Sequence, residues 1–263
     1  MDLHLKDKVI MVAGASTGLG YGVAEAVARE GARVSIASRN TENIERAAAT
    51  LCRGMDAEIS ANVCDVTDPV AIEKWRDSTL NVFGTIDGLV VNAGGPPPGK
   101  FDQFDDADWQ KGFELTLLSS IRMIRAVLPT MREKHAGAVV TMTSTSIKEP
   151  IDILLLSNVF RSGVVSLVKS LSRDLAGEGI RINNLVPGRM DTDRARAADT
   201  AAAKRRDISI VQQRRDEEVL IPMGRYGTAQ EFGNAAAFLL SDAASYMTGS
   251  TLTIDGGKIH AVW

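Results

Sequence analysis

The sequence is poor in the residues and segments that mark disulfide-rich, metal-binding and membrane proteins. It has two cysteines and three histidines in 263 residues, and Cys52 and Cys64 are too far apart to form a CxxC motif. Neither a disulfide framework nor a metal site is predicted, and both thiols are expected to be reduced, partly buried packing residues. No apolar run reaches the roughly 18 residues that cross a bilayer, and no signal peptide is evident. We therefore expect a cytoplasmic protein with no membrane partner.

An excess of charge of either sign is also missing. The chain has 30 Lys and Arg residues against 33 Asp and Glu residues, a formal net charge of -3. Such a chain has no basic field for nucleic acid, so no nucleic-acid partner is predicted. With 44% hydrophobic and 24% charged residues, the composition is that of an ordinary globular protein. The length suits one large core, so we expect a single domain over residues 1–263.

Short apolar runs alternate along the chain with longer segments of helical periodicity. The predicted strands cover residues 8–13, 33–37, 58–63, 88–91, 138–142, 180–185 and 251–254. The predicted helices lie near residues 19–30, 41–51, 69–82, 106–134, 157–177 and 229–241. Most of the strands are apolar throughout, as strands covered on both faces must be. The alternation predicts an α/β fold with a parallel sheet between two layers of helices.

Residues 190–220 interrupt this alternation. They are rich in Ala, Arg, Asp and Glu and have weak periodicity, so we predict a helical insertion or a mobile lid. Its basic side chains either recruit an anionic substrate or form a solvated helix face. They are Arg194, Arg196, Lys204, Arg205, Arg206, Arg214 and Arg215.

A glycine-rich turn, residues 14–20 (GASTGLG), connects the first predicted strand to the first predicted helix. Glycines let the backbone approach a diphosphate closely, and a helix amino terminus offers free N–H groups and a positive dipole end. Glycines before a helix can also serve packing alone, but here strand, turn and helix follow in the order that a dinucleotide site requires. The predicted contacts are Gly14, Ser16, Thr17, Gly18, Leu19 and Gly20.

Four motifs in chain order resemble those of the short-chain dehydrogenase/reductase family. They are the GxxxGxG spacing of the glycine turn, Asn92-Ala93-Gly94, Pro187-Gly188, and LTIDGG at residues 252–257. The resemblance covers essentially the whole chain and implies a Rossmann-type, doubly wound, mainly parallel seven-stranded sheet. It also implies cofactor contacts at Asp65, Val66, Asn92, Ala93, Gly94, Pro187, Gly188, Met190 and Thr192.

The end of the second predicted strand bears on the choice of dinucleotide. NAD sites place an acid there to hold the ribose hydroxyls, whereas NADP sites carry neutral or basic groups for the 2′-phosphate. Here Ser38 stands at the position of the acid, Arg39 follows it, and Ser16 can add a hydroxyl. NADP is therefore favoured and NAD remains possible, unless Arg39 is only a solvated turn residue.

The family's catalytic residues are only partly matched. In the family a Ser polarises the carbonyl, a Tyr donates the proton, a Lys in a YxxxK pattern lowers the pKa of that Tyr and binds the ribose, and an Asn completes a proton relay. The resemblance places Ser144 at the Ser position. Ser157, Arg161 and Thr116 fall at the Tyr, Lys and Asn positions, and none of the three tyrosines lies near residue 157.

These replacements predict a slower active site. An aliphatic hydroxyl such as Ser157 is a poor general acid, and Arg161 stays charged, so it can bind ribose or phosphate without exchanging protons. A general acid is worth roughly 10² to 10⁴ in rate, less than the ~7 to 11 kcal/mol that positioning contributes. We hypothesise that Ser144, Ser157 and a shared water replace the tyrosine while Arg161 stabilises the developing alkoxide. Alternatively, Ser157 only caps its helix.

The resemblance implies an NADP-linked oxidoreductase, similar in organisation to 3-oxoacyl carrier reductases, that interconverts a small-molecule ketone and a secondary alcohol. Because the proton donor is replaced, a cofactor-binding sensor or scaffold without turnover is the main alternative, and a lyase or isomerase a lesser one. The family also implies a homotetramer or homodimer formed through the two long helices and the last strand. Residues 95–99 are expected to shape the pocket wall. Residues 153–156 are expected to form either an apolar wall for the substrate or part of the core.

Overall fold

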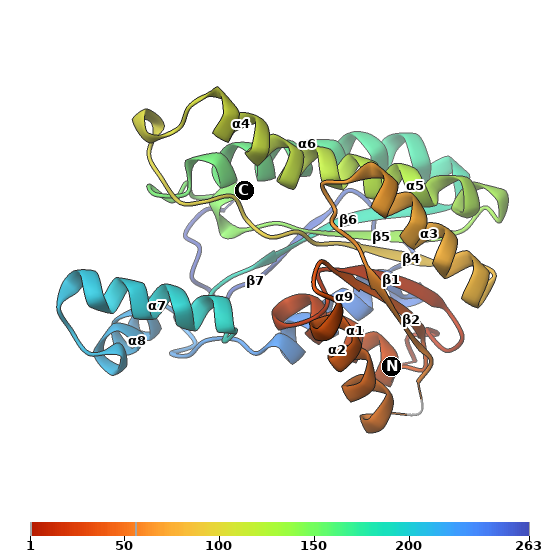
Figure 1. Cartoon of the computed structure of the whole chain (residues 1–263), viewed down its shortest axis with the longest axis horizontal. Helices are drawn as coiled ribbons and strands as arrows, with labels where there is room; N and C mark the ends of the chain where they lie inside the picture. Colours follow the sequence, from red (N-terminus) through yellow and green to blue (C-terminus); the bar gives the residue numbers. More distant parts are fainter. Residues whose placement is uncertain (1, 56, 263) are drawn as a thin grey trace.

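The computed structural model describes residues 2–55 and 57–262 of the chain (Figure 1). Its sheet has seven parallel strands in the order β3-β2-β1-β4-β5-β6-β7. The strands are β1 (Val9–Ala13), β2 (Arg33–Ser38), β3 (Ile59–Val63), β4 (Gly88–Val91), β5 (Gly137–Met142), β6 (Ile180–Pro187) and β7 (Thr251–Ile254). The predicted doubly wound α/β fold is confirmed, and the strand bounds differ from the predicted ones by at most two residues.

Helices cover both faces of this sheet. One face packs against α1 (Gly18–Arg29), α2 (Thr41–Gly54) and α9 (Ala229–Leu240). The other packs against α3 (Pro69–Phe83), α5 (Ser119–Glu133) and α6 (Leu155–Leu175), with α4 (Asp106–Phe113) leading into α5. In Figure 1, α7 (Asp193–Arg206) and α8 (Ile210–Val219) stand apart from both layers, beside the end of β7.

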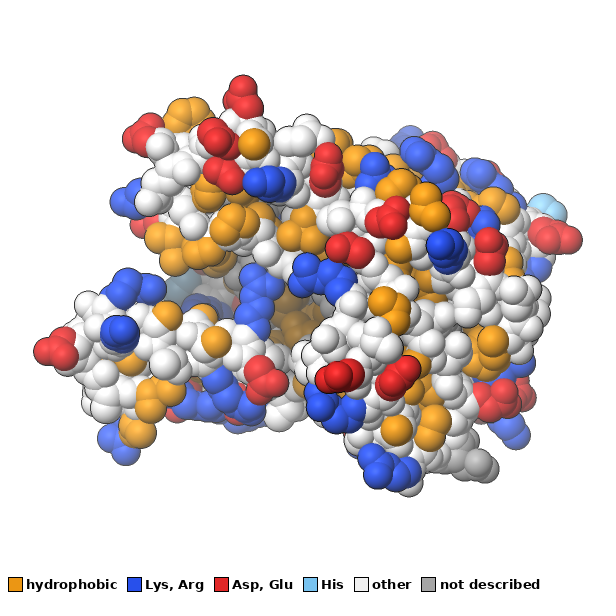
Figure 2. Space-filling model, in the orientation of Figure 1, with side chains coloured by type: hydrophobic (Ala, Val, Ile, Leu, Met, Phe, Trp, Pro, Cys, Tyr) orange, Lys and Arg blue, Asp and Glu red, His pale blue; other side chains and the backbone are white. Residues whose placement is uncertain are grey.

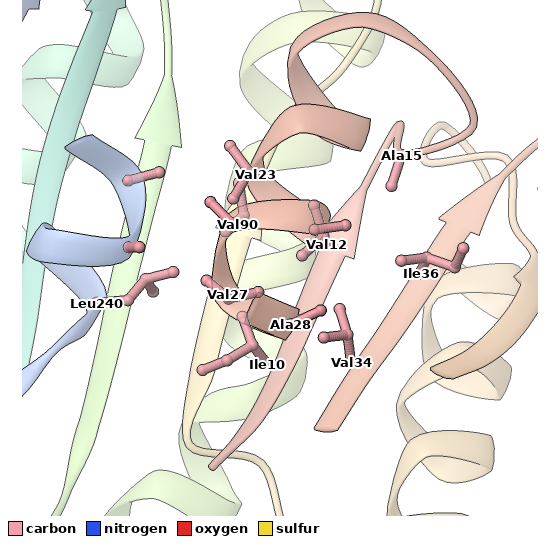
Figure 3. Close-up of a cluster of buried hydrophobic side chains, with 14 of the residues drawn as sticks. Ile10, Val12, Ala15, Val23, Val27, Ala28, Val34, Ile36, Val90 and Leu240 are labelled. Atoms are coloured by element: carbon pink, nitrogen blue, oxygen red, sulfur yellow. The ribbon is translucent and has the colours of Figure 1, made fainter. Parts of the chain in front are cut away.

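Strand β1 shows why the apolar runs of this sequence form central strands. All five of its residues are buried, and they alternate between the two layers. Ile10 and Val12 pack under α1, as Figure 3 shows, whereas Met11 and Ala13 pack in the opposite layer. A strand with helices on both faces needs apolar side chains at every position rather than at alternate ones.

The predicted single helix over residues 106–134 is divided in the structure. A π-helical turn over Glu114–Leu118 separates α4 from α5. Thr116 lies in this turn and is buried. Turns of this kind insert one extra residue and are frequent at functional sites.

Two local predictions are wrong. Helix α6 begins at Leu155 with Leu154 at its N-cap, so Ser157 lies inside the helix and does not cap it. Cys52 is exposed rather than partly buried, because it lies in the last turn of α2 on the side away from the sheet. Cys64 is buried as expected, and burial raises the pKa of its thiol to about 12. No helix of the described residues is both long and apolar enough for a membrane span.

The start of α9 contributes acid-sensitive stability. Thr228 accepts a hydrogen bond from the Glu231 N–H at 3.1 Å, and the Glu231 carboxylate accepts one from the Thr228 N–H at 2.8 Å and forms an ion pair with Arg225 at 2.6 Å. The Arg225 guanidinium and then the Thr228 N–H lower the pKa of Glu231 to about 2. A carboxylate with a lowered pKa stabilises the fold above its ordinary pKa and loses that contribution as pH falls toward the lowered value.

We therefore expect Glu231→Gln to lower the urea midpoint of unfolding at pH 7, by an amount that shrinks as the pH falls from about 4.5 toward about 2. Urea titrations at several pH values measure it. Glu30→Gln is the control, because Glu30 is an exposed acid that forms no ion pair with any of the described residues. A pH-independent difference for Glu231→Gln would show that its charge contributes nothing.

Candidate functional site

The glycine turn at the start of α1 leaves its backbone uncovered. Gly14 and Gly18 have φ values of 60° and 63°, which favour glycine. A Cβ at Gly20 would lie 2.3 Å from the carbonyl oxygen of Gly14, so the turn is too tight for any side chain there. Thr17 occupies the N-cap position, yet no side chain caps the first turn of α1. Open backbone N–H groups at a helix start suit an anion such as a diphosphate.

Neighbouring strands hold this turn in place. The Asn92 side chain, just after β4, donates hydrogen bonds to the carbonyls of Ala13 at 3.2 Å and Gly14 at 3.3 Å. The Ala15 N–H donates to the carbonyl of Ala37 in β2 at 3.1 Å. The turn thus lies where the strand order reverses between β1 and β4, the usual ligand site of an open α/β sheet.

Four more predicted site residues lie at or just after the carboxyl ends of β2 and β3: Ser38, Arg39, Asp65 and Val66. Ser38 accepts a backbone hydrogen bond from Cys64, which brings the two strand ends together. Arg39 is exposed and forms no ion pair with any of the described residues. Burial alone would raise the pKa of Asp65, but hydrogen bonds from Thr67 and the charge of Arg39 bring it below its ordinary value. An anionic carboxylate at residue 65 and a cation at residue 39 therefore border this end of the site.

A cavity of about 610 Å³ opens beyond the ends of β4, β5 and β6. Figure 2 shows the cleft between the α7–α8 segment and the rest of the molecule, with Lys and Arg side chains at its mouth. Ten of the predicted site residues line the cavity: Leu19, Asn92, Ala93, Ser144, Ser157, Arg161, Pro187, Gly188, Met190 and Thr192. The other predicted cofactor residues lie outside its wall: Gly14, Ser16, Thr17, Gly18, Gly20, Ser38, Arg39, Asp65, Val66 and Gly94. The turn and the cavity meet where a Cβ at Gly18 would lie 3.8 Å from Thr192.

Ser157 and Arg161 are hydrogen-bonded to each other on the cavity wall, and Ser144 lines the same wall without a bond to either of them. Arg161 donates to Ser157 Oγ at 3.2 Å and to the carbonyls of Met142 at 3.0 Å and Thr143 at 3.2 Å. Ser144 Oγ accepts a hydrogen bond from the Ser146 N–H at 3.2 Å. Because each serine oxygen already accepts a bond from the protein, its own O–H is left to donate to a ligand in the cavity.

The charge of Arg161 persists at neutral pH. Burial, and then repulsion from Arg194, lowers the pKa of Arg161 to about 10. That value is still well above 7, so the guanidinium can stabilise negative charge near Ser157.

Thr116 is not brought to the cavity. It does not line the cavity wall, and its hydroxyl is buried with no hydrogen-bond partner among the described residues. Three of the four predicted catalytic residues therefore line one cavity, and the fourth, Thr116, lies in the π-helical turn outside its wall.

Apolar residues form another part of the wall. Gly95 and Pro96 line it, as expected for the loop over residues 95–99. The run over residues 153–156 is divided: Leu154 lines the cavity, Leu156 is buried in the interior, and Ile153 is exposed. The two interpretations of this run, a greasy wall and core packing, each hold for one residue.

Sequence analysis missed the carboxyl-terminal segment of the site. Lys258 and Ile259 line the cavity. The segment is held by Glu149, whose Oε1 accepts hydrogen bonds from the N–H groups of His260 at 2.7 Å and Ala261 at 3.0 Å, and by an ion pair between Lys258 and Glu217 of α8 at 3.3 Å. Backbone N–H groups make most of these contacts, so no side-chain motif marked the segment. The described residues contain no group of three or more His, Cys, Asp or Glu side chains suited to a metal ion.

The chain is similar in sequence to known reductases. The sequence profile of a family described as enoyl-(acyl carrier protein) reductase matches residues 14–258. The chain is 33% identical over 262 residues to the 3-oxoacyl-[acyl-carrier-protein] reductase FabG of Escherichia coli (strain K12), covering 97% of this chain and 98% of that protein.

Solved structures of similar proteins superpose closely. L-sorbose reductase from Gluconobacter frateurii, complexed with NADPH and L-sorbose, has a TM-score of 0.95 at 26% identity, covering 100% of both chains. YwfH, an NADPH-dependent reductase involved in bacilysin biosynthesis, has a TM-score of 0.92 at 26% identity, covering 98% of this chain and 100% of that one.

Proposed function

Because the chain belongs to the short-chain dehydrogenase/reductase family, we propose that it is an NADP-dependent oxidoreductase that interconverts a small-molecule ketone and a secondary alcohol. One observation carries the proposal: the glycine turn and the Ser144–Ser157 pair border the same cavity. A dinucleotide whose diphosphate lies at the turn can extend its nicotinamide into that cavity. Two structural relatives with TM-scores of 0.92 or more are described with NADPH.

The residues present fit such a cofactor. The turn formed by Gly14, Ser16, Thr17, Gly18, Leu19 and Gly20 would hold the diphosphate, and Asp65, Val66, Asn92, Ala93 and Gly94 would contact the adenosine half and the nearer ribose. Pro187, Gly188, Met190 and Thr192 would contact the nicotinamide half, and Arg161 its ribose. Ser38 and Arg39, with Ser16, favour NADP because residue 38 is not an acid and the cation beside it can bind the 2′-phosphate.

The chain's own residues would act on the carbonyl as follows. When bound, the nicotinamide supplies the hydride. The O–H groups of Ser144 and Ser157 donate hydrogen bonds to the carbonyl oxygen. These two hydrogen bonds become shorter as negative charge develops on that oxygen. A water shared by the two serines supplies the proton through Ser157 Oγ and recovers one from the solvent, while Arg161, which donates to Ser157 Oγ, stabilises the negative charge that develops on the carbonyl oxygen.

We propose that Ser157 and Arg161 stand at the family's Tyr and Lys positions, so the site works without a phenol. None of the described tyrosines lines the cavity. The absence of a tyrosine from the cavity wall also favours a second candidate function, a protein that binds the cofactor and senses or scaffolds without turnover.

We also propose that the segment formed by α7 and α8 closes over the bound substrate. The chain is further proposed to form a homotetramer or homodimer, and sedimentation tests this oligomeric state.

Turnover separates the two candidate functions. The protein is mixed with NADPH and a panel of ketones, and oxidation of NADPH is followed by absorbance. Oxidation is expected with some of them, and Ser144→Ala is expected to lower its rate by about 10² to 10³, the cost of losing one donor to a developing oxyanion. NADPH binding without oxidation by any carbonyl would favour the sensor, and an undiminished rate for Ser144→Ala would contradict the hydroxyl relay.

A further inference from the structure

We propose that the cavity selects a substrate bearing a carboxylate close to its reacting carbonyl, and that Arg161 and Arg194 bind this carboxylate together. The inference rests on the proposed function and adds to it the chemical class of the substrate. Arg161 comes from α6, and Arg194 comes from the first turn of α7 on the other wall.

The charges around the cavity single out these two residues. Arg189 pairs with Asp199 and lies 3.7 Å from Glu217, and Lys258 also pairs with Glu217. Glu149, the other acid on the wall, accepts two backbone N–H groups of the carboxyl-terminal segment. Within residues 2–55 and 57–262, no carboxylate lies within ion-pair distance of Arg161 or Arg194.

The basic residues of the α7–α8 segment do not share this property. Arg196, Arg206 and Arg214 form ion pairs with acids of the same segment. Lys204, Arg205 and Arg215 lie outside the cavity wall. Recruitment of an anion and a solvated helix face were both predicted alternatives for these seven basic side chains, and only Arg194 lines the cavity.

Both guanidinium groups have donors to spare. Arg161 uses Nε and Nη1 for Ser157 and two backbone carbonyls, and its Nη2 has no partner in the described part of the chain. Arg194 makes no hydrogen bond to the described residues, and one of its terminal nitrogens lies 2.6 Å from the position that a Cβ at Gly95 would take. Because Gly95 has no side chain, the guanidinium of Arg194 can lie against the cavity wall at this position. The fork of Arg194 can hold a carboxylate in two parallel hydrogen bonds, and Nη2 of Arg161 adds a further donor.

Two like charges facing one cavity repel each other, and this repulsion contributes to the lowered pKa of Arg161. An anion between them removes the repulsion and fills the spare donors. The diphosphate of the cofactor also accepts hydrogen bonds from forked donors, but in the proposed function the open amides at the start of α1 hold it. The hydroxyl of Ser157, which Arg161 contacts, places the free donor of Arg161 next to the reacting carbonyl instead.

Calorimetry on the protein–NADP⁺ complex, which holds no hydride to transfer, tests the inference without turnover. The probes are 2-oxobutanoate and its isosteric amide, 2-oxobutanamide. The acid is expected to bind about tenfold or more tighter than the amide, and Arg194→Gln is expected to remove that preference while NADP⁺ affinity stays within about threefold. Arg205→Gln, which deletes an exposed charge on the same helix outside the cavity, is expected to keep it.

Equal affinities for acid and amide in the unaltered protein, or no measurable binding of either, would overturn the inference. So would an Arg194→Gln variant that loses NADP⁺ affinity while keeping the acid preference, because Arg194 would then serve the cofactor's diphosphate. Failure of the proposed function gives a different result from failure of this inference. In that case the protein would not bind NADP⁺ when the complex is first formed, or no ketone would oxidise NADPH.

Discussion

Replacing Gly20 by alanine is expected to lower the affinity for NADPH by about 100-fold. The new Cβ would lie 2.3 Å from the carbonyl oxygen and 2.8 Å from the carbonyl carbon of Gly14, closer than real Cβ atoms approach. Both contacts are with backbone, so the turn must open rather than a side chain move aside. Opening it misaligns the N–H groups at the start of α1, and a hydrogen bond to a charged group is worth about 1.5 to 3 kcal/mol. Fluorescence titration with NADPH measures the change.

Gly54→Ala is the matched control, because a Cβ at the last residue of α2 meets nothing within 4 Å. Thermal unfolding of both variants separates a local change in the turn from loss of the fold. If folded Gly20→Ala protein bound NADPH as tightly as the unaltered protein, the turn would not be the diphosphate site.

Restoring a phenol and an amine to the cavity is expected to raise turnover. In the double variant Ser157→Tyr, Arg161→Lys, kcat for a ketone that the protein reduces should increase by about 10² to 10⁴, the value of a positioned general acid. Ser157 lines the cavity, so a larger side chain at this position projects into open space. The amine introduced at residue 161 would be close enough to favour the ionised phenol and so lower its pKa. Steady-state kinetics at saturating NADPH measure the effect.

One single variant and one control variant show whether the increase in kcat comes from the phenol at residue 157. Arg161→Lys alone should not raise kcat, because no phenol is present and the carbonyls of Met142 and Thr143 lose the Nη1 donor that they share. Val159→Tyr adds a tyrosine at an exposed position of the same helix outside the cavity and should change nothing. A folded double variant that binds NADPH normally and turns over no faster would contradict the placing of Ser157 and Arg161 at the family's Tyr and Lys positions.

The sequence was sufficient to predict the sheet because the sheet depends on local patterns. Buried parallel strands such as β1 are apolar at every position, and each helix between them carries its own periodicity. The glycine turn was equally predictable, since its chemistry lies within seven consecutive residues. Boundaries were harder to predict, and the start of α6 shows why. Leu154 occupies the N-cap without a side-chain cap, so no local signal marks the helix start, and Ser157 was mistaken for a possible cap.

The rest of the site depends on contacts between distant segments. Glu149 reaches backbone N–H groups more than 100 residues further along the chain, and backbone donors leave no pattern in a sequence. Arg194 was one of seven similar basic residues until the structure showed which of them face the cavity. The π-helical turn that contains Thr116 was not predictable either, because its residues continue the apolar periodicity of the flanking helices.

We propose that the glycine turn and the cavity together bind one NADPH molecule. Calorimetric titration of the unaltered protein with NADPH and with NADH measures this binding. NADPH is expected to bind in the micromolar range and about tenfold or more tighter than NADH, because Arg39 can bind the 2′-phosphate. If neither dinucleotide associated at millimolar concentrations, the turn and the cavity would not be a dinucleotide site.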